Sequence, residues 1–317
     1  MKFNTALNEF LEYIEDNRAY SLYTVESYKN DIRQFCEILG EDGNIETDFL
    51  FIKANIRHFI YKLNDAGLSN KTIARKRASL MSFAKFLVKI GVLPVNPVRY
   101  IAAPKPPKPI PTFVSEPSMN LLEDTLEESE TRDKLIVELL YGSGIRVSEL
   151  QRMLKSRISY HYKTVKVTGK GDKERIVPLT DKSIELLKLY TAEVANPSDF
   201  VFTRTAKSGR HEYIDYGKTS EKKQKFRNTE RKLLSVRRIR QIVERELSRV
   251  YDGEKKSPHV LRHSFATHLL DNGVEISYVK DLLGHQSLAS TQIYTHTTME
   301  KMLKSFKQAH PRSGAEI

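Results

Sequence analysis

The stretch from Ser257 to His296 constrains this chain most, because it sets reactive side chains on short helices with sharply marked ends. Ser257 is a favourable N-cap and Pro258 a favourable first helical residue, so a helix is predicted to begin there. Asn272-Gly273 predicts the end of that helix, and Gly284 predicts the end of a second short one. The side chains of interest on this stretch are His259, Arg262, His285 and Tyr294.

His259 and Arg262 lie three residues apart, which places them on one face of the first helical turn, near the positive end of the helix dipole. His285 follows in the turn after Gly284, and Tyr294 lies a few turns further on. The pattern is suited to gathering donors around one phosphate and bringing a phenol to it. A lone His, Arg or Tyr on a helix is more often a packing or surface residue, so this interpretation depends on further cationic residues upstream.

Two upstream motifs supply such residues. The sequence YGSGIRVSEL, from Tyr141 to Leu150, places Arg146 just after a glycine-bearing turn that opens a helix. Glu149 lies on the same face, where it either orients the Arg146 guanidinium or caps or packs elsewhere. The sequence VKVTGKGDKERIVPL, from Val165 to Leu179, predicts a β-hairpin with Lys170 at its tip.

Length, net charge and cysteine count limit the kinds of binding partner, cofactor and cellular location that fit this chain. The 317 residues are enough for two domains, and the net charge of +12 favours a polyanion as partner. The sequence has no apolar run of about 18 residues and no N-terminal signal pattern, so we expect a cytoplasmic protein without a membrane anchor. Cys36 is the only cysteine, which excludes an intramolecular disulfide and a thiolate metal cluster. Asp271 and Asp281 stand without acidic companions, so no Mg²⁺ site is expected.

Residues 1–100 predict four helices from apolar residues at helical spacing, the third over 55–65 and the fourth from Ser69 to Gly91. The fourth helix carries a run of cations on its other face, namely Lys71, Arg75, Lys76 and Arg77. Such a run is often a solvated face; with a phosphate site downstream, phosphate contact is the preferred interpretation.

Residues 101–111 are rich in proline and predict a semi-rigid linker, in which Lys105 and Lys108 are suited to lie on a phosphate backbone. Helices are then expected over 115–129, 132–141, 183–195 and 236–250. Between the last two, residues 204–235 form a basic tract with few apolar residues. Its composition is typical of a flexible segment, with phosphate contact preferred over a solvated loop.

The motifs GIRVSEL, GKG, HVLRHSFATHLL, LLGHQSLASTQIYTH and AHPRSG occur in this order over nearly the whole chain. In order and spacing they resemble those of the tyrosine site-specific recombinases, most closely the Xer-type enzymes. The basic tract is longer than the corresponding stretch of those enzymes. The resemblance implies a mainly α fold with a small β-hairpin or sheet, organised as a two-domain DNA clamp.

On this resemblance, residues 1–100 form a helical, SAM-like core-binding domain, and residues 112–317 form the catalytic domain. The C-terminal tail is expected to dock on a neighbouring protomer; the alternative is that it covers its own domain. The positions that match the active site of the family are Arg146, Lys170, His259, Arg262, His285 and the nucleophile Tyr294.

The chemistry implied is attack of Tyr294 on a DNA phosphodiester, giving a 3′-phosphotyrosyl bond without metal, ATP or another cofactor. Arg146 and Arg262 are expected to stabilise the non-bridging oxygens, and Lys170 is the candidate acid for the leaving 5′ oxygen. His259 is a candidate to assist removal of the phenol proton, since a pKa near 10 makes tyrosine a poor nucleophile at neutral pH. His263 and His268 are interpreted as structural.

The implied role is Xer-like resolution of chromosome or plasmid dimers, by a tetramer of this chain or of this chain and a paralogue, on DNA with an inverted-repeat site. A DNA translocase is a candidate activator. The first alternative is the integrase or transposase-type recombinase of a mobile element. Two further alternatives are a type IB topoisomerase-like enzyme and a non-catalytic DNA-binding protein; the filled active-site positions argue against the latter.

Overall fold

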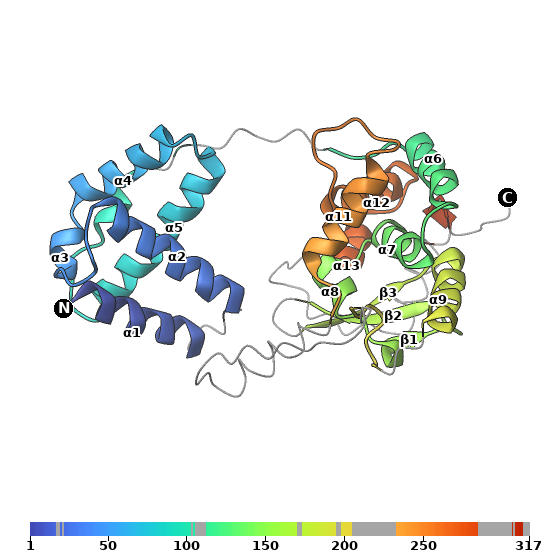
Figure 1. Ribbon diagram of the computed structural model, residues 1–317, viewed down its shortest axis with the longest axis horizontal. Coiled ribbons are helices and arrows are strands. Elements are labelled where there is room, and N and C mark those ends of the chain that lie inside the picture. Colours follow the sequence, from blue (N-terminus) through green and yellow to red (C-terminus); the bar gives the residue numbers. More distant parts are fainter. Residues whose placement is uncertain are drawn as a thin grey trace. The chain divides into compact units, whose positions relative to one another are not determined.

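The computed structural model describes residues 1–16, 20, 22–102, 104, 112–169, 173–194, 198–204, 233–284, 306 and 308–312. The chain forms two compact units, Met1–Ile110 and Pro111–Ile317 (Figure 1). The described residues are mainly helical with one small antiparallel sheet, which confirms the predicted fold class.

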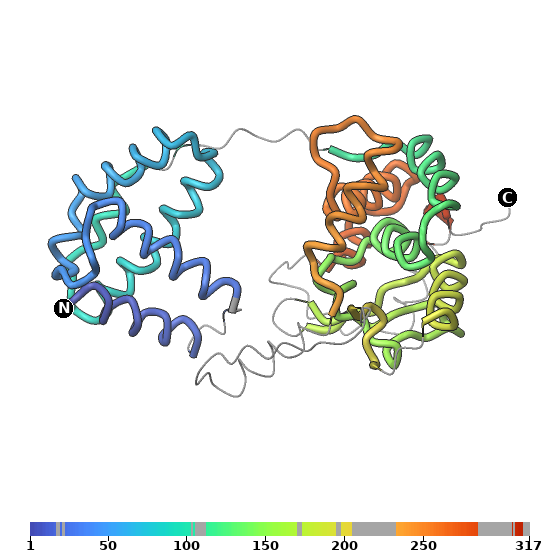
Figure 2. The backbone as a smooth tube through the Cα atoms, in the orientation of Figure 1, coloured from blue at the N-terminus to red at the C-terminus, as the bar shows by residue number. Residues whose placement is uncertain are grey.

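The N-terminal unit contains the four predicted helices and two short elements that the sequence did not indicate. The elements are α1 (Phe3–Asp16), α2 (Leu22–Ile38), α3 (Thr47–Leu50), α4 (Lys53–Asp65), α5 (Asn70–Lys89) and the 3-10 helix η1 (Pro97–Tyr100). The backbone trace in Figure 2 shows α5 running through this unit, and it packs against α1, α2, α4 and η1. Ser69 caps α5 by accepting a hydrogen bond from the backbone N–H of Thr72 (3.3 Å), as its residue type predicts.

Phenylalanine side chains fill the core of this unit. Phe83 on α5 packs against Phe10 of α1 and Phe51 after α3, with ring centroids 5.2 and 5.4 Å apart. Burial of large aromatic side chains is the main favourable contribution to folding of so small a helical unit.

The C-terminal unit is built around α7 (Thr131–Gly142), which is buried along nearly its whole length. It packs against α9 (Asp181–Glu193), α11 (Val236–Leu247) and α12 (Pro258–Asp271), as Figure 1 shows. The remaining helices of the unit are α6 (Glu116–Leu126), α8 (Val147–Gln151), α13 (Ile276–Leu283) and the 3-10 helix η2 (Lys155–Arg157). The buried helix α7 thus runs through the core of this unit, and it ends at Gly142, just before the turn that leads to Arg146.

The predicted hairpin is present as β2 (Thr164–Thr168) and β3 (Glu174–Pro178), paired antiparallel from Thr164 opposite Pro178 to Thr168 opposite Glu174. A two-residue strand that the sequence did not predict, β1 (Ile158–Ser159), pairs with the other edge of β2. Residues 170–172 of the hairpin lie outside the described residues.

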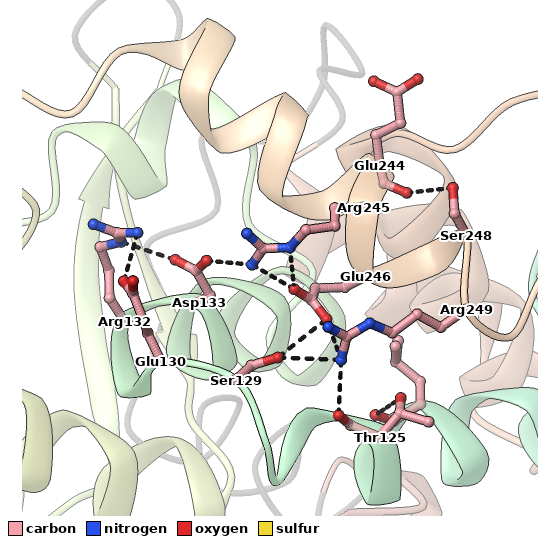
Figure 3. A network of polar contacts seen from close by, with 11 residues as sticks. Thr125, Ser129, Glu130, Arg132, Asp133, Glu244, Arg245, Glu246, Ser248 and Arg249 are labelled. Atoms are coloured by element: carbon pink, nitrogen blue, oxygen red, sulfur yellow. Dashed lines mark hydrogen bonds and ion pairs between the residues drawn. The ribbon is translucent and has the colours of Figure 1, made fainter.

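A polar network joins α7 to α11 (Figure 3). Asp133 on α7 and Glu246 on α11 are both buried carboxylates. Arg245 bridges them, with Nη2 at 2.5 Å from Asp133 Oδ2 and at 2.5 Å from Glu246 Oε1. Arg132 and Arg249 contribute further ion pairs to the two carboxylates. Buried charges persist only when paired, so this network fixes how α11 lies on α7.

The described end of the chain packs on its own unit. Phe306 and Ala309 belong to the core of the C-terminal unit, and Arg312 forms an ion pair with the buried Glu138 of α7. Residues 306 and 308–312 thus pack on their own domain in this structure. Residues 299–305 and 313–317 lie outside the described residues, and docking on a neighbouring protomer stays a prediction for them.

Within the described ranges, no helix combines the length and apolar character needed to cross a membrane. The same part of the chain contains no cluster of three or more His, Cys, Asp or Glu side chains suited to a metal ion.

Candidate active site

The turn after α7 brings Arg146 to the site. Gly144 has a left-handed backbone (φ +59°), and a Cβ atom on it would overlap the ring of Phe265 on α12. Glycine is therefore required here both for its conformation and for the close approach of the turn to α12. The turn ends at Arg146, which is the N-cap residue of α8.

Glu149 fixes the Arg146 side chain. Its Oε2 accepts a hydrogen bond from the Arg146 backbone N–H (2.8 Å), and its Oε1 accepts one from Nη1 of the Arg146 guanidinium (2.9 Å). The carboxylate thus caps the first turn of α8 and orients the guanidinium at once. The structure therefore confirms that Glu149 orients the Arg146 guanidinium, and the capping contact is made to Arg146 as well rather than elsewhere.

Three consecutive carbonyl groups at the C-terminal end of α13 each accept a hydrogen bond from a different arginine. Leu282 O accepts from Arg175 Nε (3.1 Å), and Gly284 O accepts from Arg146 Nη2 (2.9 Å). Between them, Leu283 O accepts from Arg262 Nη2. A helix C-terminus carries partial negative charge on such carbonyls, which favours cations. The helix end therefore collects arginines from β3, the N-cap of α8 and α12.

Arg262 is buried and held from two sides. Its Nη1 donates to Gly144 O and its Nη2 to Leu283 O, so it joins the turn before Arg146 to the end of α13. Burial, together with the positive charges of Arg146 and Arg175, lowers the pKa of Arg262 to about 9. The guanidinium stays charged at neutral pH.

The carboxylate of Glu149 compensates part of this positive charge. Burial favours its protonated form, but hydrogen bonds and charge from Arg175, followed by hydrogen bonds from Arg146, lower the pKa of Glu149 below its usual value. Glu149 is therefore ionised at neutral pH. Three guanidiniums against one carboxylate leave two positive charges, a local excess suited to a phosphodiester.

The structure describes three of the six predicted active-site residues. Arg146 and Arg262 converge on the end of α13, and His259 is exposed on the first turn of α12, one turn before Arg262. α12 begins at Pro258 as predicted, although the side chain of Ser257 makes no capping hydrogen bond.

Lys170, His285 and Tyr294 lie outside the described residues. The residues that precede two of them are described. Gly169 donates its N–H to Lys173 O (2.8 Å) at the end of the hairpin strands, and Gly284 precedes His285 directly.

Sequence reasoning missed Arg175, which is the third arginine of the cluster. A signal for it was present, because Arg175 and Val177 lie two apart on β3 and share one face of the strand. Val177 is buried, so Arg175 also points inward, and its side chain is only 9% exposed. A charged residue on the inward face of a strand requires a partner, which is Glu149.

The cations of α5 differ in what they contact. Arg75 and Lys76 both pair with the buried Asp31 of α2, and Arg77 donates to the carbonyl groups of Ile101 and Val98 at η1. Lys71 is exposed near the start of the helix. Lys105 and Lys108 lie outside the described residues.

A second basic surface lies at the start of α11. Arg237, Arg238 and Arg240 are exposed, while Ile239 and Val243 on the other face are buried. The sequence prediction of a helix here was right, but it did not single out these arginines.

The two further histidines of α12 differ in burial. His268 is buried, and its Nδ1 lies 2.9 Å from the hydroxyl oxygen of Tyr141. His263 is exposed.

Comparison with known proteins gives consistent matches over both units. Residues 113–301 match the Phage integrase family, and residues 7–91 match the N-terminal SAM-like domain of phage integrases. Tyrosine recombinase XerC of Chlorobaculum tepidum is 34% identical, over 97% of this chain and 94% of that protein. Tyrosine recombinase XerC of Listeria monocytogenes is 35% identical, over 96% of this chain and 97% of that protein.

Solved structures share the fold. A lambda integrase dimer bound to a COC′ core site has a TM-score of 0.65 at 17% identity and covers all of this chain and 79% of that chain. A lambda integrase tetramer bound to a Holliday junction has a TM-score of 0.66 at 17% identity, covering 93% of this chain and 80% of that chain.

Proposed function

Because the chain belongs to the phage integrase family of tyrosine recombinases, we propose that it cuts and rejoins double-stranded DNA at a specific site through a phosphotyrosyl bond at Tyr294. The observation that supports this most is the convergence of Arg146 and Arg262 on the end of α13, directly before His285. Two fixed guanidiniums are the groups that a pentacoordinate phosphate requires as charge builds on its non-bridging oxygens.

In the proposed cleavage step, the phenolic oxygen of Tyr294 attacks the phosphorus and forms a 3′-phosphotyrosyl bond while the bond to the 5′ oxygen breaks. The phenol proton leaves with assistance from His259, and Lys170 protonates the departing 5′ oxygen. His285 donates a hydrogen bond to the phosphate. The reverse reaction, attack by a 5′ hydroxyl, restores a phosphodiester, so the step needs no ATP and no metal ion.

DNA binding is proposed for the basic surfaces. The net charge of +12 favours a polyanion, and the exposed Arg237, Arg238 and Arg240 of α11 offer donors to phosphates or base edges. In the N-terminal unit, exposed Lys71 is a better candidate than Lys76 and Arg77, which are engaged within the unit. Arg75 also pairs with Asp31, but its side chain stays 51% exposed, so it remains a candidate beside Lys71. Lys105 and Lys108 of the proline-rich segment are proposed to contact the phosphate backbone of DNA.

The proposed biological role is resolution of chromosome or plasmid dimers in the cytoplasm, by a tetramer on an inverted-repeat site. Full-length similarity to proteins named XerC supports this role over that of a mobile-element integrase. A paralogous partner subunit and a DNA translocase as activator are predictions that accompany it.

The experiment that tests the role is sequencing of DNA that is covalently attached to the protein in cells. We expect reads that converge on one inverted-repeat site on a chromosome or plasmid. Reads at the ends of a mobile element would assign the integrase or transposase function instead. Absence of any attached DNA, with the protein expressed and folded, would contradict strand cleavage itself.

A further inference from the structure

Arg175 is bound on all sides by groups of the candidate active site. Its Nη1 and Nη2 donate to the two carboxylate oxygens of Glu149 (2.5 and 2.9 Å), and its Nε donates to Leu282 O (3.1 Å). Each of its three guanidinium nitrogens is therefore engaged. The side chain is 9% exposed, whereas that of Arg146 is 33% exposed. Arg146 is the residue that can reach a substrate, and Arg175 is enclosed behind it.

The Glu149 carboxylate is bound more fully by the Arg175 guanidinium than by the Arg146 guanidinium. Arg175 presents a two-pronged fork to both oxygens, while the Arg146 guanidinium makes one hydrogen bond to Oε1. A bidentate pair is the stronger and better defined of the two arrangements. With its charge compensated mainly by Arg175, the carboxylate can orient Arg146 without neutralising it. This matters because a guanidinium paired fully with its own carboxylate would have little charge left for a phosphate.

Arg175 also supports the end of α13. Gly284 has a left-handed backbone (φ +63°), and a Cβ atom on it would lie 3.1 Å from Arg175 Cδ. The arginine side chain thus packs against the residue whose carbonyl oxygen accepts from Arg146. It holds the preceding turn through Leu282 O at the same time.

We propose that Arg175 is a positioning residue of this active site, which compensates Glu149 and holds the end of α13 so that Arg146 is oriented and keeps its charge for the scissile phosphate. The inference rests on the proposed function, since it concerns the same phosphate site. Arg175 acts through Arg146 and does not itself contact DNA.

An alternative role for Arg175 is to position the tip of the β2–β3 hairpin instead of Arg146. A Cβ atom on Gly169, the neighbour of Lys170, would lie 3.3 Å from Glu149 Oε1. If the pair served the hairpin, loss of Arg175 would impair protonation of the leaving group. The two roles predict different responses to changes in the substrate.

The experiment measures single-turnover cleavage by Arg175→Gln and Arg175→Lys on three substrates. The first is an ordinary phosphodiester. The second is a methylphosphonate at the scissile position, which lacks one non-bridging charge and so needs less stabilisation from the arginines. The third is a 5′-bridging phosphorothiolate, whose leaving group needs no proton. Arg157→Gln is the matched control, because Arg157 pairs with Glu174, the neighbour of Arg175, through an exposed ion pair.

We expect Arg175→Gln to cleave ordinary DNA on the order of 100-fold more slowly than wild type, with DNA affinity retained, since small misplacements of reacting groups have effects of this size. The deficit should shrink at least about tenfold on the methylphosphonate and stay unchanged on the phosphorothiolate. Arg175→Lys should fall between wild type and Arg175→Gln because it keeps the charge but not the fork. Arg157→Gln should cleave as wild type.

Two results would overturn the inference. A deficit that is equal on all three substrates would reduce Arg175 to a structural residue, and rescue by the phosphorothiolate would assign it to the hairpin. Lys170→Ala serves as a further control, since we expect the phosphorothiolate and not the methylphosphonate to rescue it. Should Arg175→Gln fail to fold, Arg175→Lys takes its place, because it keeps a positive charge beside Glu149 and leaves Glu149 intact; the same pattern over the three substrates is expected with a smaller deficit. A wild type that forms no covalent adduct would instead refute the proposed function.

Discussion

Arg312 and Glu138, 174 positions apart in the sequence, form an ion pair inside the C-terminal unit. Arg312 is 6% exposed, donates to Met119 O (2.9 Å), and lies over the ring of Tyr141 with its guanidinium carbon 4.9 Å from the centroid. Thr180 donates a further hydrogen bond to Glu138 (2.6 Å). This ion pair anchors the chain after Tyr294 on the same unit as the chain before it. The described residues on the two sides of Tyr294, Gly284 and Phe306, both belong to the C-terminal unit.

This pair predicts a large effect of Arg312 on stability. Arg312→Ala leaves Glu138 charged and buried without its partner, which should cost about 3–5 kcal/mol. The measurement is denaturant unfolding of the full chain, following the transition of the C-terminal unit. Arg157→Ala removes an ion pair whose partners are both more than a third exposed, and should have a much smaller effect on stability because solvent screens such a pair. Equal losses for the two variants would contradict the role given to Arg312.

His310 should make stability depend on pH. Burial lowers the pKa of His310 to about 4, although the charge of Glu138 opposes the shift. An unfolded histidine titrates near 6.5, so between these values the unfolded state binds more protons and stability falls as pH decreases. The loss should reach about 2 kcal/mol between pH 7 and pH 5.

The check on His310 is the same unfolding experiment with His310→Gln at both pH values. This window lies above the range in which Glu138 and Glu149 titrate, because the pKa of each is lowered in the folded state. His268 also contributes to the pH dependence in this window, because burial lowers its pKa. This contribution is the same in wild type and in His310→Gln, so it cancels in the comparison. An unchanged pH slope in His310→Gln would show that His310 is not neutral in the folded protein.

Arg146 and Arg262 should matter for cleavage more than for binding. Arg146→Ala or Arg262→Ala should slow cleavage of a suicide substrate by on the order of 10²–10³-fold, since charge stabilisation is strongest in the transition state. DNA affinity, measured in parallel, should change far less. Arg262→Lys should not restore the rate, because one ammonium group cannot span Gly144 O and Leu283 O. Losses that appear equally in affinity and rate would contradict this assignment.

The basic tract is predicted to contribute to DNA affinity through phosphates. Deletion of Gly209 to Arg231 should leave a folded protein whose affinity for DNA is weaker and less dependent on salt. Each lost phosphate contact lowers the slope of log affinity against log salt concentration by roughly 0.9. The comparison needs titrations at several salt concentrations with the same DNA. An unchanged slope would assign the tract to solvent.

The sequence predicted local structure well where proline, asparagine or glycine marks the start or the end of a helix. Pro258, Asn272-Gly273 and Gly284 placed the ends of α12 and α13 correctly, because proline and glycine limit the backbone directly. The one-turn helix α3 and the strand β1 were missed, since elements of four and two residues depend on their neighbours rather than on their own pattern.

What could not be predicted is how distant segments meet. Nothing local indicates that Arg146 donates to Gly284 O, 138 positions later, or that Arg175 completes the cluster. The same limit applies to α5, where Lys76 and Arg77 resembled surface cations. Their partners, the buried Asp31 and the carbonyl groups at η1, are specified only by the tertiary fold.

The measurement that tests strand cleavage most directly is the covalent adduct formed by wild type and by Tyr294→Phe on a suicide DNA substrate. Wild type should form an adduct with the 3′ phosphate, and mass spectrometry of the digested adduct should find the nucleotide on Tyr294 and on no other of the 15 tyrosines. Tyr294→Phe should bind the same DNA with unchanged affinity and form no adduct, because only the nucleophilic oxygen is lost. An adduct formed by Tyr294→Phe, or a nucleotide found on a different residue, would contradict the assignment.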